Sequence, residues 1–157
     1  MHRFFRFKII KKYRRVRRIR RTVHGTELLF LGEPNPILFK NKDEIVKWYK
    51  EKAKEILTER MEHYSKVTGW KYSKLSITNA QTRWGSCSHS NKINLSLRLA
   101  MVPVEIIDYV VVHELAHIVE KSHKASFWNK VREILPDYEK RRAQLRLYEK
   151  RIIRTAK

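Results

Sequence analysis

The residues with the clearest chemistry lie in the run 111–117, which reads Val-Val-His-Glu-Leu-Ala-His. His113 and His117 are four positions apart, so on a helix their side chains lie one turn above each other. At that spacing both imidazoles can reach one Zn²⁺ ion, with nitrogen-to-metal distances of about 2.0–2.1 Å. Glu114 is rotated by about 100° from His113, and its carboxylate can accept a proton from a water on the metal. The H-E-x-x-H pattern therefore predicts a metal site that activates water.

A zinc ion that does chemistry needs a third protein ligand and one open position. His123 comes six positions after His117, and on a continuing helix a rotation of about 600° would turn it away. We therefore expect the helix to end between them, with Ser122 capping the next helix and His123 folding back over the site. If His123 lies on the surface instead, Glu120 is an alternative ligand. Three imidazoles suit Zn²⁺, and ligand type alone leaves Ni²⁺, Co²⁺ or Fe²⁺ open.

The elements that must hold these side chains follow from the spacing of apolar residues. We predict helices over about residues 43–67, 104–119, 124–135 and 138–153. Asn41 or Asp43 can cap the first helix, and Gly69 lies just past its end. We predict strands at 3–10, 26–31, 75–79, 82–87 and 92–97, with a hairpin turn at 88–91. The prolines of segment 33–36 predict a loop there. The pattern indicates an α+β fold with a small antiparallel sheet.

The net charge of +20 is concentrated at the two ends of the 157-residue chain. Residues 1–26 hold 11 basic residues and no acidic one, and residues 138–157 hold 8 basic and 2 acidic residues. We divide the chain into a basic N-terminal segment with short strands, 1–40, and a catalytic domain with a basic C-terminal helix, 41–157. The ends are candidates for contact with nucleic acid or another polyanion, or are simply solvated basic surfaces. The candidate phosphate contacts are Arg14, Arg15, Arg17 and Arg18.

Composition excludes several other classes of protein. The single cysteine, Cys87, rules out a disulfide framework and an all-cysteine zinc site, and we expect it to be a small buried residue. No apolar run approaches the roughly 18–20 residues of a membrane span. Residues 1–21 lack the uninterrupted apolar stretch of a signal peptide, so a cytoplasmic location is expected.

Several segments beyond the metal motif resemble the YgjP-like metallopeptidase family, relatives of the SprT-like zinc proteases. The resemblance runs from about residue 44 to 147. It is carried by Trp-Gly-Ser-Cys at 84–87, the strand at 93–99, the helix at 107–117, Ser-His-Lys-Ala-Ser-Phe-Trp at 122–128 and Pro-Asp-Tyr at 136–138. Ser122 stands where the family has asparagine, and Lys124 where it has serine. Residues 1–40 match poorly.

The resemblance implies His113, His117 and His123 as ligands of one Zn²⁺ ion and Glu114 as the general base. It also implies a minimal zincin fold, in which a small sheet packs on an active-site helix and a backing helix. A polypeptide substrate commonly pairs with an edge strand of such a sheet, and the hairpin at 82–97 is the candidate here.

Other polar residues are weaker candidates for roles in the site. Stabilisation of an oxyanion needs a hydrogen-bond donor, and the candidates are Tyr138, Arg83, His89 and Tyr109. Asp108 or Asp137 could orient a ligand imidazole. Trp84 and Trp128 are expected in the core.

The sequence favours a zinc-dependent peptidase and leaves two alternatives open. One is a metal-dependent nucleoside triphosphate (UTP) pyrophosphohydrolase, which the resemblance allows, although with 4 glycines the chain lacks a glycine-rich phosphate loop. The other is a DNA-associated protease like the SprT-like proteins, acting through the basic ends.

Overall fold

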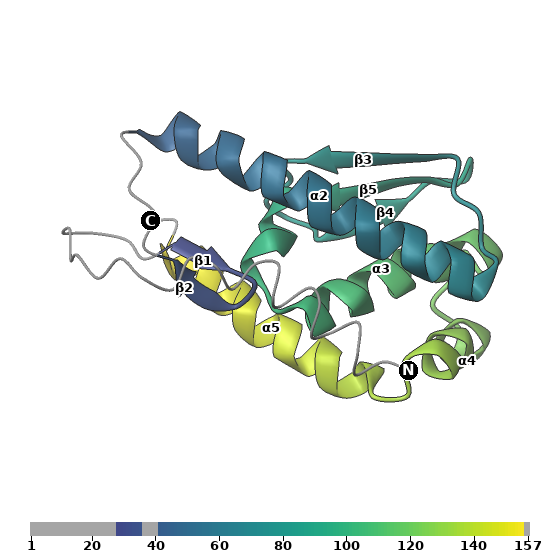
Figure 1. Ribbon diagram of the computed structural model, residues 1–157. Helices are drawn as coiled ribbons and strands as arrows, with labels where there is room; N and C mark the ends of the chain where they lie inside the picture. The colour runs from purple at the N-terminus through teal and green to yellow at the C-terminus, as the bar shows by residue number, and fades with distance from the viewer. Residues whose placement is uncertain (1–27, 36–40, 156–157) are drawn as a thin grey trace.

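A three-stranded sheet packs against helices of very different length in a computed structural model that describes residues 28–35 and 41–155 (Figure 1). The elements run in the order β1 (Leu28–Phe30), β2 (Glu33–Asn35), α2 (Lys42–Thr68), β3 (Lys74–Thr78), β4 (Gly85–Cys87), β5 (Lys92–Ser96), the 3₁₀ helix η2 (Leu97–Met101), α3 (Val104–Val119), α4 (Ala125–Ile134) and α5 (Tyr138–Thr155). Within these ranges, no helix is both long and apolar enough to cross a bilayer.

Helix α2 is the backing helix, and it begins and ends as its sequence predicts. The Asn41 side chain accepts a hydrogen bond from the backbone N–H of Glu44 at 3.0 Å, which satisfies a free donor of the first turn. Gly69 adopts a left-handed conformation (φ 74°), and its N–H bonds to the Ser65 carbonyl. The buried face of the helix packs on the rest of the core through Tyr49, Ala53, Ile56, Leu57, Met61 and Tyr64.

Helix α3 carries the H-E-x-x-H pattern through the middle of the molecule. It contacts α2, α4, α5 and strand β4, and in Figure 1 it lies between the sheet and α5. Because neighbours surround it, the helix is apolar on nearly every side. Its last residue is Val119, and Glu120 is extended, so the helix ends between His117 and His123 as predicted.

The three-stranded sheet has the order β3-β5-β4, and its strand directions differ from the prediction. Strands β4 and β5 are antiparallel and joined by the predicted turn at 88–91, but β3 pairs with β5 in parallel. The chain reverses once between β3 and β4 and again between β4 and β5, so β3 and β5 run the same way. The α+β fold is confirmed, whereas a purely antiparallel sheet was wrong, because apolar spacing does not reveal which strands become neighbours.

The segment at 33–36 was predicted as a loop, yet residues 33–35 form strand β2. Strand β2 pairs with β1 in a two-stranded hairpin, where Pro34 faces Leu29 and the proline's missing donor is tolerated at an edge. Leu31 and Gly32 both have positive φ, as a two-residue hairpin turn requires. Their backbone N–H groups bond to carbonyls of η2 at 2.8 and 3.1 Å. The predicted strand at 3–10 lies outside the described residues, and the division at residue 40 stays a prediction.

Candidate metal centre

Three histidines converge at the C-terminal end of α3. The Nε2 atom of His123 lies 3.1 Å from Nε2 of His117 and 3.1 Å from Nε2 of His113. A single nitrogen carries either one hydrogen or one lone pair, so a hydrogen bond accounts for only one of these two approaches. Tetrahedral zinc with bonds of 2.0–2.1 Å places neighbouring ligand nitrogens about 3.3 Å apart. The donor set therefore fits one divalent metal ion, and these residues could hold it.

The orientation of His117 is set by the end of its own helix. Its Nδ1 atom lies 3.1 Å from the backbone carbonyl oxygen of Glu120, which can only accept a hydrogen bond. The hydrogen therefore sits on Nδ1, and Nε2 is left with a lone pair for a metal. The Nδ1 atom of His113 is buried with no hydrogen-bond partner in the described part of the chain.

The loop that returns His123 to the site is organised by Glu120. Its carboxylate accepts hydrogen bonds from the Ser122 hydroxyl at 2.9 Å and the Ser126 hydroxyl at 2.8 Å. The prediction that Ser122 caps α4 was wrong: the N-cap is Lys124, without a side-chain bond, because Ser122 donates to Glu120 instead. These serine contacts also occupy Glu120, the alternative third ligand.

Aromatic side chains of α4 pack against the three histidines. The Phe127 ring is fully buried, with its centroid 4.5–4.9 Å from the centroids of His113, His117 and His123. Trp128 stacks on the exposed His123 ring at 5.7 Å and, in turn, on Tyr138 at 5.5 Å. The ligand on the loop is thus held by stacked rings.

Burial favours the neutral form of His113 and His117, which is the form that binds metal. Desolvation, followed by the neighbouring histidines and Arg142, lowers the pKa of His113 to about 3. Desolvation also lowers the pKa of His117.

Glu114 lies beside the histidines in a dry position against strand β4. Burial raises the pKa of its carboxyl to about 8, so the carboxylate is a stronger base than an exposed glutamate. The missing side chain of Gly85 makes this position possible, because a Cβ atom there would lie 2.6 Å from Oε1 of Glu114. The site therefore combines three imidazoles that could hold a metal ion, two on α3 and one on the following loop, with a buried carboxyl group on α3.

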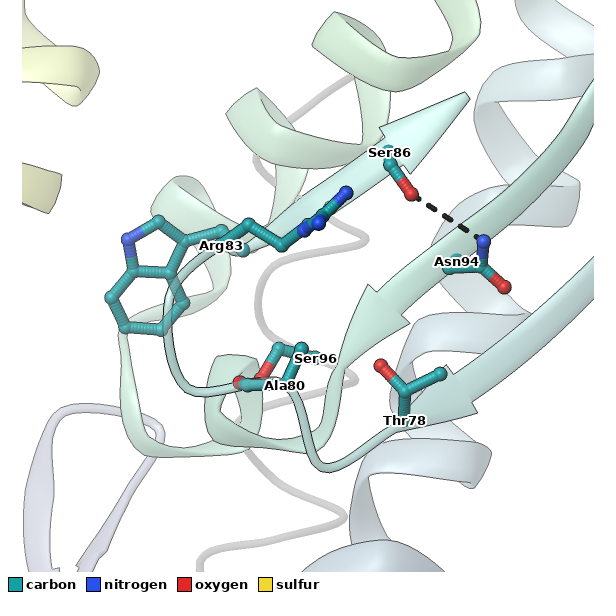
Figure 2. Close-up of a pocket in the computed structure, with 8 residues that line it drawn as sticks. Thr78, Ala80, Arg83, Ser86, Asn94 and Ser96 are labelled. Carbon is teal, nitrogen blue, oxygen red and sulfur yellow. Dashed lines mark hydrogen bonds between the residues drawn. The ribbon is translucent and has the colours of Figure 1, made fainter. Parts of the chain in front are cut away.

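Among the described residues, no hydrogen bond joins Tyr138, His89 or Arg83 to the three histidines. The Tyr138 hydroxyl donates to Glu139 at 3.0 Å, and His89 is exposed in the turn between β4 and β5. Arg83 lines a small pocket on the polar face of the sheet, together with Thr78, Asn94 and Ser96, as Figure 2 shows. Arg14, Arg15, Arg17 and Arg18 lie outside the described residues.

Neither aspartate orients a ligand imidazole. Asp108 is buried and pairs with Arg60 of α2 through two hydrogen bonds, at 2.5 and 3.0 Å. Asp137 pairs with Arg141 at 2.9 Å. Tyr109 packs beside His113, with a ring-centroid distance of 5.9 Å. Trp84 and Trp128 are partly buried against the core, as expected.

Gly85 and Phe127, which shape the site, were not among the candidates predicted from the sequence, and Glu120 was considered only as a ligand. Gly85 makes room for Glu114, Glu120 organises the loop, and Phe127 forms the floor. A glycine at the start of a strand signals close approach of another group, but not which group approaches.

Several solved structures are similar to this chain. The crystal structure of the metallopeptidase zymogen abylysin of Pyrococcus abyssi matches with a TM-score of 0.52 and 21% identity, over 57% of this chain and 90% of its own. The metallopeptidase zymogen of Methanocaldococcus jannaschii jannalysin matches with a TM-score of 0.47 and 22% identity, over 62% of this chain and 95% of its own. Wss1 of Saccharomyces cerevisiae matches with a TM-score of 0.46 and 22% identity, over 67% of this chain and 84% of its own. No curated protein matches the chain.

The abylysin likeness and the histidine cluster define a zincin-like metallopeptidase fold. A family model for the YgjP-like metallopeptidase domain matches residues 3–148, so the chain belongs to the YgjP-like family. The match begins at residue 3, which extends the resemblance well before residue 44, where the sequence analysis began it. A metallopeptidase domain of this family implies a metal cofactor and a polypeptide substrate.

Proposed function

We propose that this chain is a zinc-dependent endopeptidase in which His113, His117 and His123 hold one Zn²⁺ ion and Glu114 is the general base. One observation carries the proposal: the three Nε2 atoms converge, and Glu114, the residue that follows His113, is buried. Bound zinc would polarise the peptide carbonyl and make water acidic enough to attack at neutral pH.

The chain's own contribution to the reaction is proton transfer by Glu114. Its carboxylate accepts a proton from the attacking water and passes it to the nitrogen of the leaving amine. A base of raised pKa suits both steps, because it takes the proton readily and still releases it near neutral pH. The close approach of Gly85 restricts the Glu114 carboxyl group, so this group is already positioned for proton transfer before the substrate binds.

Strand β4 is the proposed docking edge for the substrate. It lies at the end of the β3-β5-β4 sheet, so in the described part of the chain one of its edges has no strand partner. Gly85 in this strand touches Glu114, so a peptide paired to that edge passes close to the base. Main-chain hydrogen bonds along β4 would hold an extended substrate with little regard to its side chains.

Metal removal and reconstitution test the proposal. Protein stripped by a chelator is expected to lose hydrolysis of an unstructured protein, and one equivalent of Zn²⁺ per chain is expected to restore it. His123→Ala should bind zinc more weakly and stay inactive at that ratio. An enzyme that keeps full activity without metal contradicts the proposal.

The same preparations separate the alternatives. Release of pyrophosphate from UTP without cleavage of protein would favour the pyrophosphohydrolase. Cleavage only in the presence of DNA would favour a DNA-associated protease. Cleavage of free, unstructured protein alone is the result we expect.

A further inference from the structure

Arg142 of α5 lies close to the three histidines, and Arg146 follows it one helical turn later. Arg142 is exposed, and its guanidinium carbon lies 4.9 Å from the ring centroid of Trp128. The same indole ring lies 5.7 Å from His123 and 5.8 Å from His113. One aromatic ring therefore separates this cation from two of the three histidines.

Arg146 extends the positive charge along the helix. It follows Arg142 by four positions, so both side chains lie on one face of α5. Burial raises the pKa of Tyr109 on α3, and the positive charges of Arg142 and Arg146 oppose that rise.

Within residues 28–35 and 41–155, neither arginine has a carboxylate partner. Among the ion pairs of the described residues, the arginine partners are Arg60, Arg132 and Arg141, and never these two. The nearest acidic residues of α5 are Glu139 and Glu149. Glu139 accepts a hydrogen bond from the Tyr138 hydroxyl, and the negative charge of Glu149 raises the pKa of Arg98 against the effect of burial.

The positions of α5 and β4 put this charge across from the substrate-docking edge. Helix α3 contacts β4 on one side and α5 on another, and Figure 1 shows it between the two. A peptide lying along β4 over Glu114 would therefore pass along α3, with α5 on the other side of that helix. From α5, the Arg142 guanidinium reaches the histidines through the ring of Trp128.

We propose that Arg142, with Arg146 behind it, forms a cationic subsite that selects peptides with an acidic side chain close to the bond being cut. This inference rests on the proposed peptidase function and names its substrate class. A carboxylate can bind the planar guanidinium group through two parallel hydrogen bonds. Stacking on Trp128 holds that group in place beforehand, so little ordering is needed when the substrate binds.

Charge-matched peptides test the subsite. Cut sites are first mapped on an unstructured protein, and quenched peptides are then made with Glu, Gln or Lys at the positions flanking one site. The wild type is expected to prefer the Glu peptide. Arg142→Gln should lower kcat/KM for that peptide about five- to tenfold, mainly through KM, and change the Gln peptide less than about twofold. Arg142→Glu should favour the Lys peptide.

Arg132→Gln is the matched control. Arg132 also lies over an aromatic ring, Tyr138 at 5.6 Å, but it already pairs with Glu139 at 3.8 Å. Its replacement should leave the charge preference unchanged, and the zinc content of all variants should stay equal. Equal loss for all three peptides, no charge preference in the wild type, or the same effect from Arg132→Gln overturns the proposal.

Binding keeps this inference distinct from the peptidase proposal. Affinities of the same peptides for zinc-loaded Glu114→Gln are measured without turnover, with a single-stranded oligonucleotide as a further ligand. If the wild type cuts no peptide, the proposed function fails, while a tighter Kd for the Glu peptide still supports the subsite. Equal affinity for the three peptides, or no peptide binding, overturns the subsite. It is also overturned if Arg142→Gln weakens binding of the oligonucleotide but of none of the peptides.

Discussion

At the scale of single residues, the chemistry of the site depends on side chains held in dry contact. Glu114 is buried among apolar residues and pressed against a backbone that lacks a Cβ atom. The same burial that raises its pKa also leaves it little room to turn. The carboxyl group is therefore sensitive to small changes around it.

Gly85→Ala tests this contact. The added methyl group would lie 2.6 Å from Oε1 of Glu114, so the carboxyl group must move. We expect hydrolysis to fall at least about 100-fold, because a misplacement of about 1 Å is that costly to catalysis. Zinc content should not change, since the three histidines are untouched. Wild-type activity in this variant would show that Glu114 needs no fixed position.

Cys87 is only partly buried, whereas the sequence predicted a buried residue. Burial raises the pKa of its thiol, and the Lys121 ammonium group, 3.9 Å away, opposes the rise. The thiolate needed for alkylation should therefore form only at a pH above that of an ordinary cysteine. The rate of reaction with iodoacetamide, followed against pH, is expected to reach its midpoint at higher pH than in a free thiol. Lys121→Gln should move it higher still. A midpoint below the ordinary value would mark an activated cysteine.

At the scale of elements, one buried ion pair ties the active-site helix to its backing helix. Arg60 of α2 and Asp108 of α3 are nearly inaccessible, with side chains 6% and 10% exposed. Arg141 of α5 approaches the same carboxylate at 3.9 Å. This contact joins three helices around the segment that precedes His113.

Removing one partner of this buried pair should lower the free energy of unfolding much more than removing one partner of an exposed pair. Asp108→Asn leaves Arg60 buried without its counter-charge, and we expect a loss of about 3–5 kcal/mol in the free energy of unfolding. Asp137→Asn is the control, because its pair with Arg141 leaves the carboxylate 53% exposed and should be worth less than about 1 kcal/mol. Urea unfolding of both variants measures the difference. Equal losses would refute a special role for the buried pair.

Local sequence patterns predicted most of the helices and strands, but they did not predict which distant segments come into contact. Asn41, Gly69 and the apolar period between them were sufficient for α2, because caps and amphipathic spacing are local. The H-E-x-x-H spacing likewise placed His113, Glu114 and His117 on one helix. The parallel pairing of β3 with β5 and the contact between Gly85 and Glu114 join distant segments, which no local pattern reports.

At the scale of the whole molecule, the hairpin before α2 belongs to the same core as the site. Leu29 and Phe30 are buried, and the Tyr49 hydroxyl of α2 donates to the Leu29 carbonyl. Gly32 sits so close to Pro103, just before α3, that a Cβ atom would lie 2.6 Å from the proline ring. The hairpin thus supports the start of the active-site helix.

Phe30→Ala measures that support. Truncating a buried aromatic ring should cost about 3 kcal/mol of unfolding free energy. Val67→Ala is the control, because that side chain is 56% exposed and should change stability by less than about 0.5 kcal/mol. Thermal unfolding of the two variants compares them. A loss no larger than that of Val67→Ala would mean that the hairpin is an appendage.

The large positive charge divides between the described fold and the ends of the chain. Arg142 and Arg146 belong to the described part of α5, where the charge can act on a substrate. The 11 basic residues of segment 1–26 lie outside the described residues, and their contact with nucleic acid stays a prediction. Such contact should weaken steeply with salt, whereas a direct contact between Arg142 and a peptide carboxylate should depend on salt much less.

The central claim is that Glu114 moves the proton while the histidines hold the metal. Zinc content and hydrolysis of an unstructured protein, measured together on Glu114→Gln and the wild type, test it most directly. We expect one zinc per chain in both proteins and a loss of turnover of at least about 100-fold in the variant. Zinc-loaded Glu114→Gln that hydrolyses protein at the wild-type rate would contradict the account.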